Sequence, residues 1–433
     1  MLSIKKSLMH LACHSACVVL LCFSASHQAF ANLSNDDPLS VLPTEANVRK
    51  SFEKLPQLRA STLGVNLAND QKVRLEAGSH EWTARVGVSR RNEQLSGQGF
   101  QEQELAIERP IRWFGKAEKD RAIGEKGIAV AQASHADQWH EASRSLMKEW
   151  FDALRERTVL AQLRQQLEIV EQLAAIAAKR VKAGDAAKVE QLLAETEVQR
   201  VRALVQQSEQ REEVALQVLQ MSYPNLASSI ESLNQSRTLP QPKSSLDVKS
   251  GEQWLDKIMD DNHELELAQA ENDYVGLQAA RIAQESMPDP SIGVRSSRER
   301  NGQERIVGIS ISIPLPGAAR SSERSLALTK VQIANEKLQQ TQMKVRLSAQ
   351  KVISESQRSY TTWKTMDQLR QQNAQQANLM QSAYRLGEMN LGDVLNARKM
   401  ALDAAIAADT AQIEALASYA RLHLDAHMIW ALE

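Results

Sequence analysis

Two long segments of the chain combine helix-forming residues with an apolar repeat. Residues 117–183 and 318–386 contain no proline and are rich in Ala, Gln, Glu, Leu, Lys and Arg, which favour helix. In the first segment, apolar residues recur at alternating spacings of three and four, as at the a and d positions of a coiled coil. They are Leu160, Leu163, Leu167, Val170, Ala174, Ala177 and Val181. At 1.5 Å per residue, each segment predicts a helix about 100 Å long.

Shorter segments with a period of two precede each long helix. The clearest has an apolar residue at every second position: Val307, Ile309, Ile311, Ile313 and Leu315. Weaker alternation over 82–88, 104–111 and 291–298 completes two predicted β-hairpins, 82–111 and 290–315. One interpretation is a small antiparallel sheet packed on the helices. The other is a set of membrane strands, since about ten residues span a bilayer, with lipid-facing side chains at Val307, Ile309, Ile311 and Ile313.

Each long helix ends near a glycine, and the two glycines belong to an internal repeat. Gly184 and Gly387 are 203 positions apart, and so are Glu190 and Asp393. Because glycine is favoured at the left-handed C-cap of a helix, a turn is predicted at both. Further helices are expected over 44–79, 186–221, 252–287 and 389–430. The prediction is two structural repeats, 32–221 and 252–433, joined by a linker at 222–251, with each helical column running from the hairpins to the glycine turns.

The first 31 residues have the pattern of a signal peptide. Lys5 and Lys6 precede an apolar run, and an Ala-Phe-Ala sequence at 29–31 fits a cleavage site. A retained membrane anchor is the alternative, although the apolar run is short for a span. All three cysteines lie inside this segment, so the mature chain has no thiol nucleophile or cysteine metal site. Beyond it, no run of 18 apolar residues occurs, so any passage through a membrane is expected to use strands.

Charge and motifs exclude several classes of function. The formal net charge is −1, which gives no basic excess for binding nucleic acid. No Gly-rich phosphate loop or Gly-x-Ser-x-Gly motif is present, so neither an enzyme nor a bound cofactor is expected. His423 and His427 stand four apart with Asp425 between them. They present a weak metal-binding pattern, for which a polar helix end is the simpler interpretation, and no metal site is predicted.

Three stretches of the sequence resemble the TolC family of outer-membrane efflux proteins. They are PDPSIGV at 288–294, GISISIPLPGAARSSERSLA at 308–327 and YRLGEMNLGDVLNAR at 384–398. The first is similar to a strand entry common in the heavy-metal branch of the family. The resemblance covers nearly the whole mature chain, because the three stretches lie within the twofold repeat.

The resemblance implies a mostly helical fold with a small β part. Three chains would form a homotrimer with a twelve-stranded β-barrel in the outer membrane, four strands from each chain, and a coiled-coil helical tunnel across the periplasm. Family members are passive ducts, which dock at their helix tips onto a periplasmic adaptor (membrane fusion protein). The adaptor joins them to an inner-membrane pump, here expected to be of the resistance-nodulation-division type. Outer-membrane lipid is the other expected contact. Type I protein secretion, and a periplasmic coiled-coil adaptor or scaffold, are the alternatives.

The resemblance also assigns roles to residues at the helix tips. Tyr384 and Asp393 match the tyrosine and the acid of the family's second-repeat tip, and Glu190 is the acid of the first repeat. They would line or latch the constricted periplasmic mouth beside Gly184 and Gly387. Two positions depart from the pattern, because Met389 and Asn396 stand where some members carry an arginine and an aspartate. A latch built on that arginine is therefore expected to be absent or different here.

Overall fold

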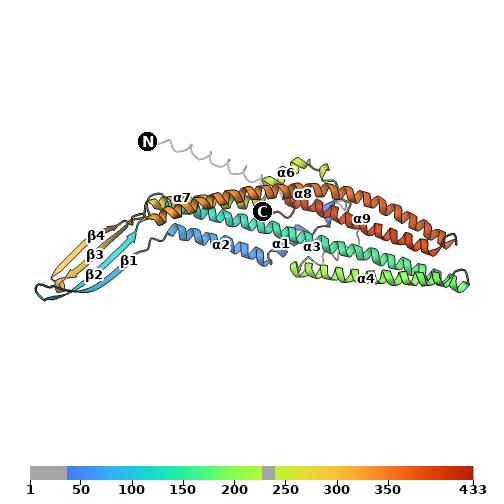
Figure 1. Ribbon diagram of the computed structural model, residues 1–433, viewed down its shortest axis with the longest axis horizontal. Coiled ribbons are helices and arrows are strands. Elements are labelled where there is room, and N and C mark those ends of the chain that lie inside the picture. The colour runs from blue at the N-terminus through green and yellow to red at the C-terminus, as the bar shows by residue number, and fades with distance from the viewer. Residues whose placement is uncertain (1–36, 227–238, 433) are drawn as a thin grey trace, which may run out of the picture.

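The computed structural model describes residues 37–226 and 239–432. The molecule is long and narrow, with a β-sheet at one end and two helical turns at the other (Figure 1). It is mostly helical with one four-stranded antiparallel sheet, which confirms the predicted fold class for a single chain. The expected signal peptide at 1–31 lies outside the described residues, and part of the predicted 222–251 linker does too.

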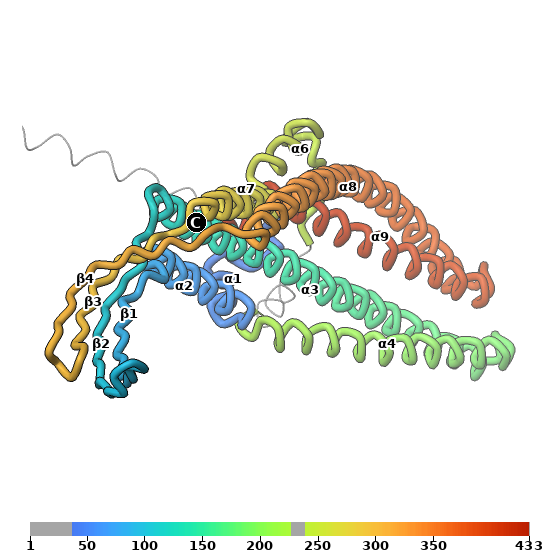
Figure 2. Tube along the Cα trace, turned by 60° about the vertical axis from the view of Figure 1, so that its left-hand side comes forward, coloured from blue at the N-terminus to red at the C-terminus, as the bar shows by residue number. Residues whose placement is uncertain are grey.

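Two helices run most of the length of the molecule. α3 (Lys116–Ala183) and α8 (Ala318–Arg385) each contain 68 residues, within two residues of the predicted bounds. α4 (Lys188–Ser222) returns along α3, and α9 (Leu391–Asp425) returns along α8 (Figure 1). Figure 2 shows the two helical hairpins extending from the same side of the molecule. Their equal lengths, 68 and 35 residues in both, agree with the twofold repeat of the sequence.

The columns between the sheet and the middle of the molecule are interrupted. The single helix predicted over 44–79 is wrong, because α1 (Glu45–Phe52) ends before Pro56, which opens α2 (Pro56–Ala77). The single helix predicted over 252–287 is also divided, into α6 (Gly251–Asp260) and α7 (His263–Ala283), because the Asn262 side chain caps α7 by accepting from the Leu265 amide. Short 3₁₀ turns complete the chain at Pro38–Val41, Ser245–Asp247, Gln284–Ser286 and Arg300–Gly302.

The sheet consists of the two predicted hairpins side by side. β1 (Thr83–Asn92) pairs with β2 (Gly99–Pro110), and β3 (Ser291–Glu299) pairs with β4 (Glu304–Ser312). The hairpins join through β2 and β3, where Ile107 lies opposite Val294. The strand order β1-β2-β3-β4 leaves β1 and β4 as edges. The prediction that a strand reaches residue 315 is wrong: β4 ends at Ser312, and Ile313 follows it next to Pro314, which lacks the donor that continued pairing needs.

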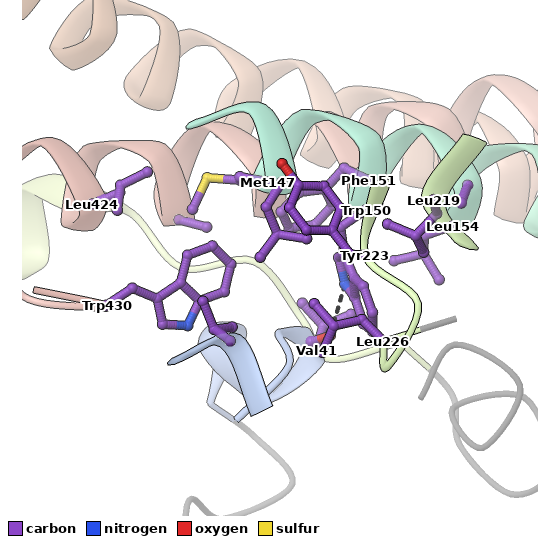
Figure 3. Close-up of a cluster of buried hydrophobic side chains, with 14 of the residues drawn as sticks. Val41, Met147, Trp150, Phe151, Leu154, Leu219, Tyr223, Leu226, Leu424 and Trp430 are labelled. Carbon is purple, nitrogen blue, oxygen red and sulfur yellow. Dashed lines mark hydrogen bonds between the residues drawn. The ribbon is translucent and has the colours of Figure 1, made fainter. Parts of the chain in front are cut away.

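A cluster of buried aromatic and aliphatic side chains holds the middle of the molecule together (Figure 3). Trp150 of α3 is buried, and its Nε1 donates to the carbonyl of Val41 at 3.1 Å. Trp430, beyond α9, joins the same cluster, and its carbonyl accepts from Trp139 Nε1 at 2.9 Å. Tyr223, at the end of α4, packs there too. Both ends of the described chain are therefore fastened to α3 at mid-length.

A buried lysine joins the sheet to the helices. Lys116 opens α3 with its side chain almost inaccessible, and Nζ lies 2.9 Å from Asp289 and 3.3 Å from Glu285. Asp289 also accepts from the Trp113 amide at 2.8 Å and lies 3.0 Å from His80 Nε2. Because a buried charge needs paired partners, this network fixes where the strands leave the helical columns.

Among the helices of the described residues, none has a stretch that is both long and apolar enough to cross a membrane.

Candidate functional site

The two glycine turns form the end of the molecule farthest from the sheet. Gly184 and Gly387 both have φ of 82°, in the left-handed region. After the first, the Asp185 amide donates to the Arg180 carbonyl at 2.9 Å, and after the second the Glu388 amide donates to the Ala383 carbonyl at 3.0 Å. Both are the six-to-one bond of a helix-ending Schellman turn. The predicted turns are therefore confirmed at both glycines, with the same geometry.

The acids after the turns differ in their surroundings. Asp393 is exposed in the first turn of α9 and belongs to a reciprocal cap, in which Asn390 Oδ1 accepts from the Asp393 amide at 2.9 Å and Asn390 Nδ2 donates to the Asp393 carboxylate at 2.5 Å. Glu190 is half-buried in the first turn of α4, and its Oε2 has no hydrogen-bond partner among the described residues. Both carboxylates lie in the first turn of a helix, where a negative side chain interacts favourably with the helix dipole.

Tyr384 does not face solvent in the single chain. Its ring is 1% exposed and packs among residues of both helical hairpins: Leu173, Ala177, Ala194, Leu391 and Val394. Its hydroxyl has no hydrogen-bond partner in the described part of the chain. The guanidinium carbon of Arg180 lies 4.9 Å from the ring centre, at cation–π distance. Sequence reasoning missed Arg180, although its place one turn before Gly184 puts it beside the helix tip.

The sheet has one apolar face. In β4, Val307, Ile309 and Ile311 are 66%, 79% and 66% exposed and alternate with residues of the other face. The register aligns them with apolar residues of the other strands, as in the row Ala84, Ile107, Val294 and Ile309. The opposite face carries ion pairs, Arg85 with Glu108 at 3.1 Å and Arg91 with Glu102 at 3.0 Å. Ile313 is also exposed but lies outside the strand.

Solved structures share this arrangement. The chain is similar to the CmeC outer membrane channel of Campylobacter jejuni, with 14% identity, 93% of this chain and 88% of that chain covered, and a TM-score of 0.70. It is also similar to the outer membrane protein VceC of Vibrio cholerae, with 14% identity, 89% of this chain and 95% of that chain covered, and a TM-score of 0.69. A membrane protein of Pseudomonas aeruginosa is 15% identical, with 89% of this chain and 90% of that chain covered and a TM-score of 0.73. The chain has the fold of the TolC family.

Comparison of the sequence with protein-family models and with curated proteins gives no match, so the assignment comes from the structure. At 14 to 15% identity the solved structures establish the fold. The resemblance to TolC proteins is therefore confirmed as a fold, whereas its heavy-metal branch remains a prediction.

Behind the second tip of this TolC fold, Arg398 holds α9 against α8. Its Nη2 donates to Asn378 Oδ1 at 2.8 Å and also contacts the Gln381 side chain. Burial, followed by the nearby charge of Arg385, lowers the pKa of Arg398 from its usual value. Of the two residues that depart from the family pattern, Met389 packs against the Tyr384 cluster and Asn396 is exposed.

His423, near the end of α9, and His427, just beyond it, both have structural surroundings. His423 is buried, with Nδ1 2.9 Å from the Tyr419 carbonyl, and Asp425 is buried against Arg144, Arg421 and His140. No group of three or more His, Cys, Asp or Glu in residues 37–226 and 239–432 is arranged to hold a metal ion. The polar helix end proposed from the sequence is wrong in one respect, because this end is buried in the middle of the molecule.

His427 belongs to a cluster that sequence reasoning missed. Its ring centre lies 4.9 Å from that of His140 on α3 and 4.4 Å from that of His263 on α7. Burial, followed by the charges that His140 and His263 would carry, lowers the pKa of His427 to about 4. Spacing along the chain gives no signal of this cluster, since its three members come from separate elements.

Proposed function

We propose that the protein is the outer-membrane exit duct of a tripartite efflux system and works as a homotrimer. One observation carries the proposal: a single chain places an apolar sheet face at one end and two matched helical turns at the other, at least 68 helical residues away (Figure 1). A helix of this length extends about 100 Å. The solved channels CmeC and VceC have the same fold, and their names describe them as outer-membrane proteins.

The sheet supports a location in the outer membrane with the helices in the periplasm. Its four strands bear an apolar face but leave the edges β1 and β4 unpaired in one chain. Lipid cannot satisfy the donors and acceptors of an open edge. Three chains joined edge to edge would close twelve strands into a barrel, with Val307, Ile309 and Ile311 facing lipid. Ile313 would extend this apolar surface just beyond the strand.

The helix tips would form the periplasmic mouth and the docking surface for an adaptor. Asp393 is exposed at the tip, so threefold symmetry would place a ring of carboxylates there, which attracts cations. Glu190 would add a second ring. Tyr384 would contribute by packing the tips of the two hairpins of each chain against one another, where its ring is buried. In this proposal the protein conducts passively and performs no chemistry, and an inner-membrane pump of the resistance-nodulation-division type selects the substrate, a metal cation, drug or other small molecule.

Extraction and conductance test the proposal. The protein is expected to leave outer membranes only with detergent, as a heat-resistant trimer, and to form pores in planar bilayers. Asp393→Asn should reduce the preference of the pore for cations while leaving the trimer intact. Asp403→Asn is the matched control, because Asp403 is also exposed on α9 but lies about three turns farther along. A water-soluble monomer would overturn the duct, and a scaffold or adaptor would then be favoured.

A further inference from the structure

The apolar face of the sheet ends in arginines at the end farthest from the helices. Arg298 of β3 lies directly opposite Arg305 of β4, next to the turn that joins these strands. Arg90 lies near the corresponding end of β1, opposite Gln101. All three are exposed. The rows between them and the helices on the same face are mainly apolar, beginning with Val86, Leu105 and Val307; the exceptions are Ser296 and, nearest the helices, Arg109.

The alternation of the strands separates charges onto the two faces. Within the four strands, every position on the apolar face lacks a carboxylate, as the alternate residues of β3 and β4 illustrate: Ile292, Val294, Ser296, Arg298, Arg305, Val307, Ile309 and Ile311. The acids Glu102, Glu108 and Glu299 lie on the other face, where they pair with Arg85 and Arg91. Arg90, Arg298 and Arg305 form no ion pair within the described residues, so their charges are unneutralised.

Directly opposed like charges destabilise an antiparallel strand pair. Arg298 and Arg305 form such a pair, and the carboxylates next to them in the sequence, Glu299 and Glu304, lie on the other face of the sheet. Guanidinium groups bind phosphate through two parallel hydrogen bonds, and two adjacent guanidinium groups suit a dianionic phosphate better than a singly charged group. An anion from outside the chain would supply the counter-charge that this face lacks.

The position of the arginines indicates where that anion lies. Arg305 is ten residues from the exposed Leu315, which lies three residues beyond the end of β4, and a chain extended over all ten residues would span about 33 Å. With a strand tilt of about 40°, the height is about 25 Å, the thickness of the apolar band of an outer-membrane barrel. The arginines thus lie at the outer boundary of that band, at the depth of lipid headgroups.

We propose that Arg298 and Arg305, with Arg90 on the same face but separated from them by β2, bind the phosphate monoester of a glycolipid headgroup in the outer leaflet. This inference rests on the proposed function, since it requires the sheet to lie in an outer membrane. The lipid headgroup would contact the outward-facing side of the sheet. This contact would give the sheet a preferred depth and orientation in an asymmetric bilayer.

The test uses the full-length trimer in nanodiscs of phosphatidylcholine that contain a small fraction of bisphosphorylated lipid A. Lipid that remains bound after mild detergent release is counted by native mass spectrometry. The wild type should retain the phosphorylated lipid, and Arg298→Gln with Arg305→Gln should weaken retention roughly tenfold or more, because each arginine near an anionic surface contributes to attraction. Arg85→Gln with Arg295→Gln is the matched control, since both arginines lie on the opposite face of the same sheet.

Several results distinguish the inference from the proposed function. Equal retention by the Arg298/Arg305 double variant and the wild type overturns the site, and so does equal retention of lipid A from which the phosphates have been removed. Equal retention of phosphatidylglycerol overturns the choice of a monoester. A protein that fails to enter the nanodiscs at all contradicts the proposed membrane location instead, whereas insertion without selective binding contradicts only the lipid site.

Discussion

Arg180 lies over the ring of Tyr384, with 4.9 Å between its guanidinium carbon and the ring centre, and this contact joins the two helical hairpins of one chain at their tips. Arg180 belongs to α3 and Tyr384 to α8. The contact breaks the internal repeat, because the 203-residue offset places Ala383 at the position of Arg180 and Val181 at that of Tyr384. The two tips thus share a backbone geometry but use different side chains to hold together.

The Tyr384 ring and its hydroxyl are expected to have separable effects. Tyr384→Ala should lower the free energy of unfolding by about 3 to 5 kcal/mol, because it empties a buried aromatic site between the hairpins. Tyr384→Phe should leave the stability of the unassembled chain within about 0.5 kcal/mol, because the hydroxyl has no partner there. Hydrogen exchange of residues 173–194 and 384–394 measures both effects locally.

Conductance separates packing from latching at the same residue. The Tyr384 hydroxyl is buried in the single chain, so it can bond to a neighbouring chain only if trimer assembly moves the helix tips. In that case Tyr384→Phe should raise the leak current of the closed pore without changing the stability of the single chain. Unchanged conductance together with unchanged stability would show that the hydroxyl has no role in closure, and Tyr384 would then be a packing residue.

The tip glycines should resist replacement by alanine. Gly184→Ala and Gly387→Ala should each lower the stability by about 1 kcal/mol, because a left-handed φ is strained for alanine even though the added Cβ meets no atom within 4 Å. Gly276→Ala is the control, because Gly276 lies inside α7 in open space without a positive φ. It should raise the stability by about 0.5 to 1 kcal/mol. Denaturant titration measures all three, and a stabilising tip variant would refute the left-handed turn.

Acidification should weaken the middle of the molecule through the histidine cluster. The pKa of His427 is lowered to about 4, so the unfolded chain, with a histidine pKa of about 6.5, takes up the proton first. The stability that His427 contributes is complete above about pH 6.5 and is lost as the pH falls towards 4. After a discount for partial exposure, this loss is about 1 to 2 kcal/mol.

His427→Asn tests this pH dependence, because asparagine tolerates the positive φ of 53° at this position but does not titrate. The variant should lose less stability than the wild type between pH 7.5 and 4.5, as followed by thermal unfolding of the helical signal. Asp425 affects the stability in a lower range of pH. Burial alone would raise its pKa, but the hydrogen bond from His140 and the charges of Arg144 and Arg421 hold it well below its usual value. Its contribution is lost only below about pH 4, so parallel curves above pH 4.5 would contradict the role of His427.

Periodicity along the chain predicts the parts of this fold that depend on local pattern. The heptad of α3 predicted buried residues such as Leu160, Leu163 and Val170, and the alternation of Val307, Ile309 and Ile311 predicted one apolar strand face. The breaks at Pro56 and Asn262 were missed because each depends on a single capping or starting residue inside a helical pattern. The helix-forming composition of a long segment dominates the prediction and hides the effect of one such residue.

Contacts between distant segments could not be predicted from the sequence. The tip glycines could be predicted because a left-handed turn at a helix end favours glycine. The contact between Tyr384 and Arg180 could not, because it depends on which faces of α3 and α8 meet. The His140, His263 and His427 cluster is hidden for the same reason, since its members lie on separate elements. Such sites depend on tertiary packing. The apolar pattern shows which face of a helix is buried, but it does not show which other helix packs against that face.

If the chain assembles as proposed, the unpaired edges β1 and β4 limit how long a single chain can remain unassembled. Each edge presents a row of backbone donors and acceptors beside apolar side chains, the arrangement that templates aggregation. Edge pairing with the correct partner is a second-order reaction, and so is pairing with a wrong one, so both accelerate as copies accumulate. The yield of assembled protein is therefore decided by a kinetic competition in which the rate of synthesis, and not only the stability of the final fold, determines the outcome.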